Sequence, residues 1–406
     1  MDLEQFANSA PGSLVPIFGA DPALGEWSHK AFVPDPLPDS TPELSNATYM
    51  AVAEARAALA ALDSTARQLP DPTLLRQPTL RREAQSTSEL EGTYAPLAEV
   101  LTADEDAPAS AELVEILNYV RMATFGFDGV VAGWPLTEGF LSELQGLLML
   151  GTPLESESGH LRRGQVVIGR RAEADASGFP AHAARFVPTP PGLALETGVR
   201  DLVDWLRADH RAQIDPVVLA AMSHYQFETL HPYRDGNGRL GRYLVVITFM
   251  LTGVLSEPTL TVSPWFEARR AEYYDRLFAV SSRGDWDGFV RFFAAGIRQS
   301  AESTRRQMLG LVAVQTELNE RVRQSPLRAG TAHSLIDFAI GNPSFTVGRV
   351  QAELGLSYPR ANKLISQLVD LGVLDVVNPD AYKRRFFAPD VIRVLINSPR
   401  AAETAG

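Results

Sequence analysis

The chain of 406 residues contains no cysteine. It therefore cannot form a disulfide, bind a metal through thiolates or use a cysteine nucleophile, and nothing in it indicates an oxidising compartment. Its longest mainly apolar run, Tyr243 to Leu251, is less than half of the ~20 residues that a membrane-spanning helix requires. The first residues, Met-Asp-Leu-Glu-Gln, lack the basic segment and apolar core of a signal peptide. These absences predict a cytoplasmic protein that does not cross a membrane.

Basic residues are also fewer than acidic residues in this chain. The chain has 37 Lys and Arg against 49 Asp and Glu, a formal net charge of −12. This balance argues against bulk affinity for nucleic acid, although it still allows a local basic patch. The apolar share of 45% and the charged share of 21% are ordinary for a soluble globular protein. The length allows two or three domains with a sizeable core.

The most informative stretch runs from His224 to Arg242, and a helix is predicted at its start. Asp215 and Pro216 have the residue types of an N-cap and a first helical position. Residues that share one helical face follow at Val217, Ala221, His224 and Glu228. We therefore expect the helix to present His231 at its end, where Pro232 fixes the exit of the chain.

A glycine turn follows this histidine. Gly236 and Gly238 allow successive backbone N–H groups to converge into a nest of the kind that holds phosphate oxygens. A second helix is predicted to begin near Arg239, and its N-terminal amides favour a polyanion. Arg242 lies one turn further along the same face and can contact further phosphates. Asp235 fits a magnesium ligand, because that ion usually takes one carboxylate together with substrate phosphates and water.

Other site types fit this stretch less well. An EF-hand that begins at Asp235 would have Arg239 and Val246 at its fifth and twelfth positions, where calcium needs oxygen ligands. A zincin needs His-Glu-x-x-His, and the spacing from His224 to His231 does not supply it. A plain Gly-Asn turn does not require a histidine, an aspartate and two arginines at fixed offsets.

The run His-Pro-Tyr-Arg-Asp-Gly-Asn-Gly-Arg-Leu-Gly-Arg, from His231 to Arg242, closely resembles the Fic family signature His-Pro-Phe-x-Asp/Glu-Gly-Asn-Gly-Arg-x-x-Arg, with Tyr233 in place of Phe. The resemblance implies transfer of AMP from ATP to a protein hydroxyl, with His231 as the base and Asp235 on Mg²⁺. It assigns ATP binding to the turn, the start of the next helix and two later tyrosines: Gly236, Asn237, Gly238, Arg239, Leu240, Gly241, Arg242, Tyr273 and Tyr274.

The N-terminal part is predicted to begin with an extended arm. Seven prolines in the first 44 residues favour a segment that packs over a surface without regular elements. Ser45 is a candidate cap for a helix through Ala51 to Leu62, and Pro70-Asp71-Pro72 would break it.

Thr79 to Gly92 predicts another helix, closed by glycine at its C-terminal end. The carboxylate of Glu91 is unexpected there, because the helix dipole disfavours negative charge at that end. From the residues alone, a solvated acidic turn explains it. However, Thr87-x-x-x-Glu91-Gly92 resembles the Ser/Thr-x-x-x-Glu-Gly/Asn inhibitory motif of some Fic proteins, and residues 37–101 resemble their N-terminal module. That resemblance implies that Glu91 is inhibitory.

The segment Leu161 to Gly169 is β-rich and bounded by glycine, which predicts a strand or hairpin. The exposed edge of such a hairpin can pair with a target segment by strand addition. The segment resembles the Fic flap, which holds the modified residue beside the base, and this assigns target binding to Gln165, Val166 and Val167. A structural hairpin without a partner is the alternative.

Two further helices are predicted from about 111 to 152, separated by Gly126 to Pro135. Others are predicted from 197 to 208, around 285 to 293, and as a polar connector over 301 to 324. The C-terminal part then has a winged-helix pattern of three helices and two β-rich runs: Leu335 to Ile340, a helix capped by Thr346, a helix from Ser357 to Gly372, Val373 to Val377, and Arg385 to Ala388. Six basic or polar side chains would contact phosphates in such a module: Arg360, Asn362, Lys363, Lys383, Arg384 and Arg385. Winged helices also bind proteins or dimerise, so the module alone does not establish a function.

Together these observations predict a mainly α protein: a Fic helical core with a short β-hairpin flap, an N-terminal helical module and a C-terminal winged helix, with domains at 1–105, 106–310 and 326–400. The resemblance implies a protein adenylyltransferase that uses Mg²⁺ and ATP, modifies a Ser, Thr or Tyr hydroxyl of a protein target and is auto-inhibited by Glu91. The alternatives are a DNA-binding regulator with the core as nucleotide sensor, and removal of AMP by the same site. A homodimer and a nucleic-acid partner both stay open.

Overall fold

The computed structural model describes residues 1–6, 11–21, 25–68, 76–105, 107–171, 179–327, 330–377, 379 and 383–397. The chain folds as two compact units, each built from several stretches of sequence. The first unit comprises residues 1–57, 121–254 and 269–298. The second comprises residues 58–120, 255–268 and 299–406.

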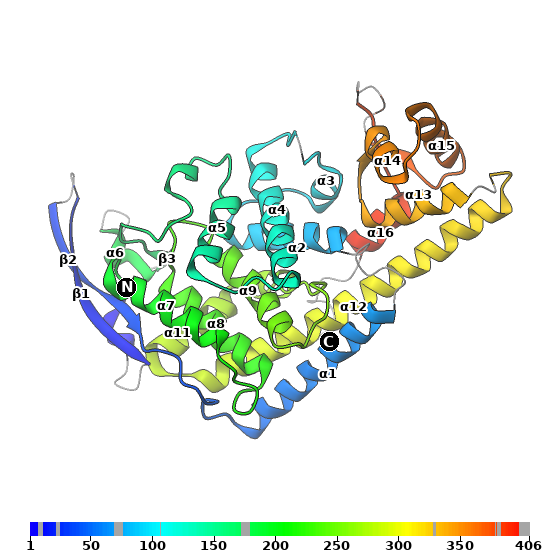
Figure 1. Cartoon of the computed structure of the whole chain (residues 1–406). Coiled ribbons are helices and arrows are strands. Elements are labelled where there is room, and N and C mark those ends of the chain that lie inside the picture. Colours follow the sequence, from blue (N-terminus) through cyan, green and yellow to red (C-terminus); the bar gives the residue numbers. More distant parts are fainter. Residues whose placement is uncertain are drawn as a thin grey trace. The chain divides into compact units, whose positions relative to one another are not determined.

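The chain is mainly helical, as predicted (Figure 1). The α-helices are α1 (Asn46–Gln68), α2 (Arg76–Glu91), α3 (Leu97–Thr102), α4 (Ala111–Val131), α5 (Glu138–Leu148), α6 (Pro180–Ala183), α7 (Leu193–Arg207), α8 (Pro216–Leu230), α9 (Asn237–Leu251), α10 (Ser263–Glu267), α11 (Arg270–Arg283), α12 (Trp286–Gln324), α13 (Gly330–Gly341), α14 (Val347–Leu354), α15 (Tyr358–Asp370) and α16 (Pro389–Asn397). The strands are β1 (Gly12–Asp21), β2 (Gly25–Pro34), β3 (Ile168–Arg170), β4 (Ala184–Phe186), β5 (Phe345–Thr346), β6 (Asp375–Val376) and β7 (Arg385–Phe387).

The N-terminal arm differs from the prediction, because β1 and β2 form a long antiparallel ribbon in place of irregular chain (Figure 1). Proline is tolerated there because each strand of a two-stranded ribbon is an edge strand, with backbone groups that need no ladder partner. Ile17 and Phe32 are buried with Phe186, and the Phe32 N–H donates to the Val187 carbonyl at 2.9 Å. Side-chain burial on one face therefore orders the arm.

The two helices predicted around 285 to 293 and over 301 to 324 form a single helix in the structure. α12 runs without interruption for 39 residues and includes both the segment around 285 to 293 and the predicted connector. No proline lies within it to end the first segment. Ser45 does cap α1, since its Oγ accepts from the Thr48 N–H at 3.3 Å. The predicted break at Pro70-Asp71-Pro72 lies outside the described residues.

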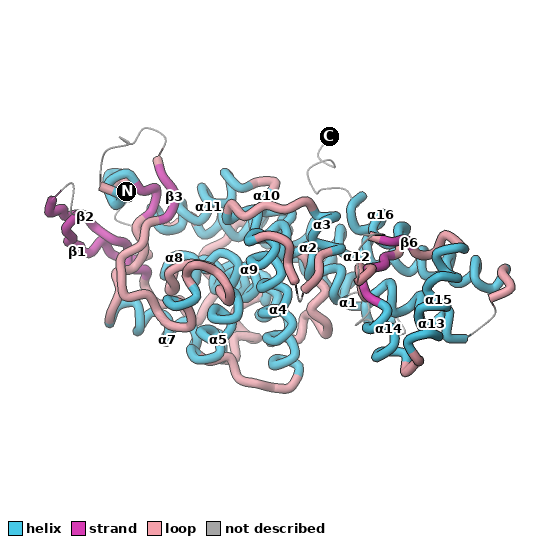
Figure 2. Tube along the Cα trace, turned by 90° about the horizontal axis from the view of Figure 1, so that it is seen from above, coloured by secondary structure: helices cyan, strands magenta, loops and turns pink. Residues whose placement is uncertain are grey.

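In the first unit α8 is the central element. It lies beside α7 and α9 (Figure 2) and also packs against β2. Nearly all of its side chains are buried. A helix that is buried on every side lies in the middle of a helical core. The chain on either side of the α8–α9 connection is therefore held rigidly.

In the second unit α2 packs against α10 and α3, and the described residues from Gly330 to Asn397 include helices α13 to α16 with a small sheet of order β5-β7-β6. These elements agree with the predicted helices and β-rich runs, including Thr346, whose side chain caps α14 by accepting from the Arg349 N–H at 3.3 Å. Arg385 does not project for phosphate contact as predicted. Its guanidinium pairs with Asp104 at 3.1 Å and donates to Ser344 Oγ at 2.7 Å.

Within the described residues, every helix is too short or too polar to cross a lipid bilayer.

Candidate active site

α8 delivers His231 as predicted. The helix begins at Pro216, and the Asp215 side chain caps it by accepting from the Val217 N–H at 2.8 Å. It ends at Leu230, and His231 is the C-cap residue in the left-handed conformation, with φ 50° and ψ 61°. His231 is the one non-glycine residue with positive φ in the described part of the chain. Such conformations are costly outside glycine and cluster at functional sites.

The hydrogen bond of the His231 ring selects its tautomer. Nδ1 lies 3.3 Å from the Glu228 carbonyl oxygen, which can only accept. Nδ1 must therefore carry the proton when the ring is neutral, which leaves the ring lone pair on Nε2. A base within this site would act through Nε2.

The loop after His231 is closed by the Asn237 side chain. Its Oδ1 accepts from the Tyr233 N–H at 2.8 Å, and its Nδ2 donates to the Tyr233 carbonyl at 2.9 Å. Gly236 lies in the left-handed region with φ 81°, and a Cβ atom there would come within 2.8 Å of Leu148 Cδ2. The turn thus requires both a glycine and an amide at these two positions, and the Asn237 amide, predicted to bind ATP, holds the loop.

α9 begins at Asn237, two residues before the predicted start. Leu240 donates the first helical hydrogen bond, to the Gly236 carbonyl at 3.0 Å. The amides of the preceding first turn therefore have no helical acceptor and form the positive end of the helix dipole. Asp235 lies beside them, with Oδ1 2.6 Å from the Gly236 nitrogen and Oδ2 3.6 Å from an Arg239 guanidinium nitrogen.

Both predicted arginines of α9 are buried. Arg239 and Arg242 are each 1% exposed, and arginines buried so deeply usually have anionic or polar partners. Arg239 also contacts Met149 Sδ at 3.9 Å. The structure therefore concentrates two cationic side chains on the first two turns of the helix whose N-terminal end follows the glycine turn.

Tyr273 is placed inside the core. Its hydroxyl lies 2.7 Å from His224 Nε2, and His224 Nδ1 lies 3.1 Å from the Gly241 carbonyl. The carbonyl requires an N–H at Nδ1, so the tyrosine hydroxyl donates to Nε2. Burial lowers the pKa of His224 to about 3, which keeps this link neutral. Tyr273 thus ties α11 to α8 and α9, while Tyr274 is partly buried beside it, with ring centroids 5.2 Å apart.

The predicted flap is mostly irregular. Only Ile168 to Arg170 is a strand, and it pairs with β4. Gln165, Val166 and Val167 precede that strand, and the Gln165 amide donates to the Val166 carbonyl at 3.0 Å and to the Pro188 carbonyl at 2.9 Å. Val167 is 38% exposed. The segment is therefore anchored to the loop after β4 by a side chain.

Arg162 is a site residue that the sequence does not reveal. Its Nε donates to the His231 carbonyl at 2.8 Å, its NH1 to the Gly164 carbonyl at 3.1 Å, and its backbone N–H to the Pro232 carbonyl at 3.0 Å. Burial lowers the pKa of its guanidinium to about 10. Arg162 thus joins the start of the flap to the histidine loop, and nothing in the pattern Leu-Arg-Arg-Gly distinguishes it from its exposed neighbour.

Glu91 is exposed and is the last residue of α2, as predicted. Gly92 follows with φ 98°, the left-handed geometry that closes a helix. Glu91 belongs to the second unit and Arg242 to the first, so their pairing stays a prediction.

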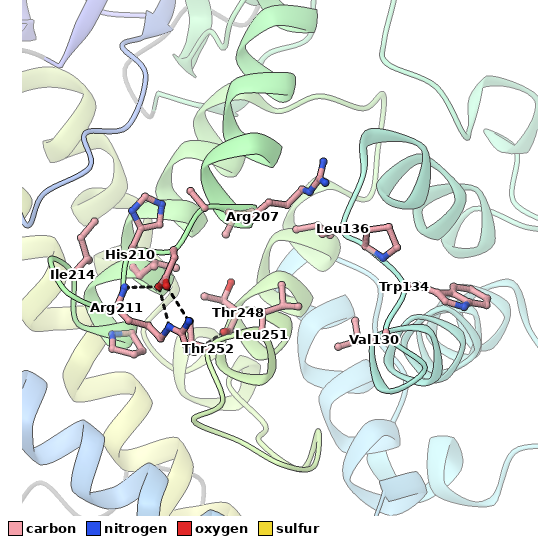
Figure 3. Close-up of a pocket in the computed structure, with 17 residues that line it drawn as sticks. Val130, Trp134, Leu136, Arg207, His210, Arg211, Ile214, Thr248, Leu251 and Thr252 are labelled. Carbon is pink, nitrogen blue, oxygen red and sulfur yellow. Dashed lines mark hydrogen bonds and ion pairs between the residues drawn. The ribbon is translucent and has the colours of Figure 1, made fainter.

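A cavity of about 460 Å³ in the first unit lies away from these residues. It lies at the far end of α9 from the glycine turn, where Thr248, Leu251 and Thr252 line it together with Trp134 and Arg207 (Figure 3). Arg211 at its edge is bound by Asp209, with hydrogen bonds of 2.9 Å. None of the predicted site residues lines this cavity.

Comparison with known protein families identifies two regions. Residues 49–128 match the model "Fic/DOC family N-terminal", and residues 135–248 match the model "Fic/DOC family". The second region contains α8, the histidine loop and most of α9. These two regions of the chain belong to the Fic/DOC family.

Curated relatives of this chain are named protein adenylyltransferases. The chain is 35% identical over 146 residues to "Protein adenylyltransferase fic-1" of Caenorhabditis elegans, which covers 36% of this chain and 24% of that protein. It is also 28% identical over 194 residues to "Protein adenylyltransferase Fic" of Drosophila willistoni. That match covers 46% of this chain and 34% of the relative. The matched part thus spans about a quarter to a third of these relatives. A Fic family protein from Desulfovibrio desulfuricans G20 shares the fold, with a TM-score of 0.53 at 22% identity over 86% of this chain and 98% of that one.

Proposed function

We propose that this protein transfers AMP from ATP to a hydroxyl group of a protein. The observation that carries the proposal is the position of His231, which lies at the start of the loop that continues into the glycine turn and the N-terminal amides of α9. A base and a phosphate-binding helix end in one loop suit nucleotidyl transfer. The family of residues 135–248 and the names of the relatives support the same activity.

In the proposed reaction the hydroxyl oxygen of the target attacks the α-phosphorus of ATP. A bond forms between that oxygen and phosphorus, the bond to the β-phosphate oxygen breaks, and pyrophosphate leaves. His231 Nε2 takes the hydroxyl proton, because Nδ1 is held in the protonated form by the Glu228 carbonyl. The first-turn amides of α9 and the Arg239 guanidinium stabilise the negative charge on the phosphates.

The residues present fit a magnesium ion. The Asp235 side chain is 45% exposed and carries more acceptor positions than its contacts to Gly236 and Arg239 use. Within the described residues, no group of three or more histidine, aspartate or glutamate side chains would hold a metal alone. Magnesium is usually held by one carboxylate together with water and substrate phosphates. Bound there, magnesium would neutralise phosphate charge.

Labelled ATP tests the proposal. When the full chain is incubated with Mg²⁺ and ATP labelled at the α-phosphorus, we expect label to become stably attached to protein. ATP labelled at the γ-phosphorus should leave none, because that group departs with pyrophosphate. Transfer of γ label would mean phosphorylation, and no transfer of α label would reject the proposal. Release of AMP from a modified protein without ATP would identify the reverse reaction.

A second candidate function rests on the C-terminal module, with the chain as a cytoplasmic regulator that binds DNA. Arg360, Lys363, Lys383 and Arg384 are exposed, and within the described part of the chain none of them forms an ion pair. A mobility-shift assay of the full chain with a DNA duplex at low salt should then show binding that weakens with salt and with the double substitution Lys383→Ala and Arg384→Ala. No shift at low salt would reject this function and leave the transferase proposal untouched.

A further inference from the structure

A small cavity of about 230 Å³ lies between the chain before the flap and the loop after His231. It lies within the first unit and is a different cavity from that in Figure 3. Its lining is mainly cationic or polar: Ser156, Glu157, His160, Leu161, Arg162, Arg163, Gly164 and Arg234. We call it the Arg163–Arg234 pocket.

The charge of this pocket is poorly neutralised. Arg162 is 5% exposed, and its guanidinium donates only to backbone carbonyls, those of Gly164, Thr189, Leu230 and His231. Arg163 forms no ion pair within the described residues. The single acidic side chain of the lining, Glu157, lies 3.8 Å from Arg234 with both side chains about half exposed. Three arginines thus face one solvated carboxylate, and a buried guanidinium without a carboxylate raises the positive potential there.

The pocket adjoins the path that a target segment would take. Gly164 lines it and directly precedes the flap residues Gln165 to Val167. Arg234 comes three positions after His231, and its NH1 lies 3.8 Å from the position of a Cβ atom on Gly164. Within the described residues β4 is the strand that pairs with β3, and strand addition by a target segment would use the other edge of β3.

We propose that the Arg163–Arg234 pocket binds the carboxylate of an aspartate or glutamate that lies close in sequence to the modified hydroxyl of the target. The inference rests on the proposed function and specifies its substrate class. An extended chain advances ~3.3 Å per residue, so a target segment that runs along the flap from Val167 to Gly164 would place the carboxylate about two to four positions from the modified residue. Arg163 and Arg234 supply the two guanidinium groups, and Arg162 joins the two segments that carry them.

The test uses the full chain, Mg²⁺, ATP and pooled synthetic peptides. Each peptide has one Ser, Thr or Tyr and random flanks, and mass spectrometry reads which ones acquire AMP. We expect Asp or Glu to be enriched at one offset from the modified residue. For single peptides, we expect kcat/KM to be about tenfold higher with Asp than with Ala there, which corresponds to ~1.4 kcal/mol, and lower still with Lys.

Charge reversal provides the control. The double variant Arg163→Glu and Arg234→Glu should lose the preference for Asp and favour Lys at the same offset. Arg200→Glu, an exposed charge reversal on α7 with a side chain 57% exposed, should keep the wild-type preference. Equal modification of all flanks, an unchanged preference in the double variant, or self-labelling without any peptide modification would each overturn the inference while the transferase proposal stands. Absence of all AMP transfer would instead overturn the proposed function.

Discussion

Replacing Glu91 with glycine is expected to raise self-modification by AMP about ten- to a hundredfold. The predicted partner of the Glu91 carboxylate is Arg242, which would otherwise meet the terminal phosphates of ATP. A productive ATP pose would have to break that pair and would meet a carboxylate beside its own negative charge. A hydrogen bond to a charged group contributes ~1.5 to 3 kcal/mol, and each ~1.4 kcal/mol is tenfold in rate. We take this modest range because Glu91 is exposed and solvent screens it.

The end of α2 tolerates this substitution. Gly92 already closes the helix in the left-handed conformation, and Glu91 carries its charge at the helix end that disfavours it. Glu89→Gly is a matched control, since it removes the same charge from the same last turn, where Glu89 accepts from the Gln85 amide at 2.8 Å. Labelling by α-labelled ATP should rise with Glu91→Gly only. Equal labelling in the wild type and both variants would mean that Glu91 has a structural role at a glycine-closed helix end.

Loss of His231 is expected to lower AMP transfer ~10²- to 10⁴-fold, the usual contribution of a general base. We expect this for His231→Ala and for His231→Asn. The second variant matters because residue 231 has φ 50°, a conformation that asparagine adopts more readily than alanine. Initial rates of α-label transfer at saturating ATP measure the effect.

Thermal melting separates chemistry from folding in these variants. His231→Asn should melt close to the wild type, because the backbone conformation and the Arg162 hydrogen bond to the residue 231 carbonyl are kept. Transfer at the wild-type rate by a folded His231→Asn variant would show that this ring is not the base. A loss of rate that follows the melting temperature would show a structural role only.

Local chemistry explains which parts were predictable from the sequence. The signals for the site are local, because each one affects only one or two turns of the chain. They are the cap at Asp215-Pro216, the residues on one helical face, and Gly236. The structure has α8, the left-handed Gly236 and α9 at these positions. The cap by Thr346 and the glycine after Glu91 are equally local.

The features that could not be predicted depend on long-range contacts. The β1–β2 ribbon is ordered by Phe32 against Val187, far away in sequence, which outweighs the prolines. The Arg162 guanidinium donates to the carbonyls of His231 and Leu230, which lie 69 and 68 residues away in sequence. Arg385 meets Asp104 and not solvent, because residues remote in sequence fold against its strand. No spacing rule encodes such contacts.

The most direct test compares three proteins by intact mass after incubation with Mg²⁺ and ATP: the wild type, Glu91→Gly, and the double variant Glu91→Gly with His231→Asn. We expect AMP additions that are few in the wild type, abundant in the single variant and absent in the double variant. Such a pattern would tie the reaction to His231 and the restraint to Glu91. AMP additions on the double variant at the level of the single variant would contradict the account, because the chemistry would then not depend on His231.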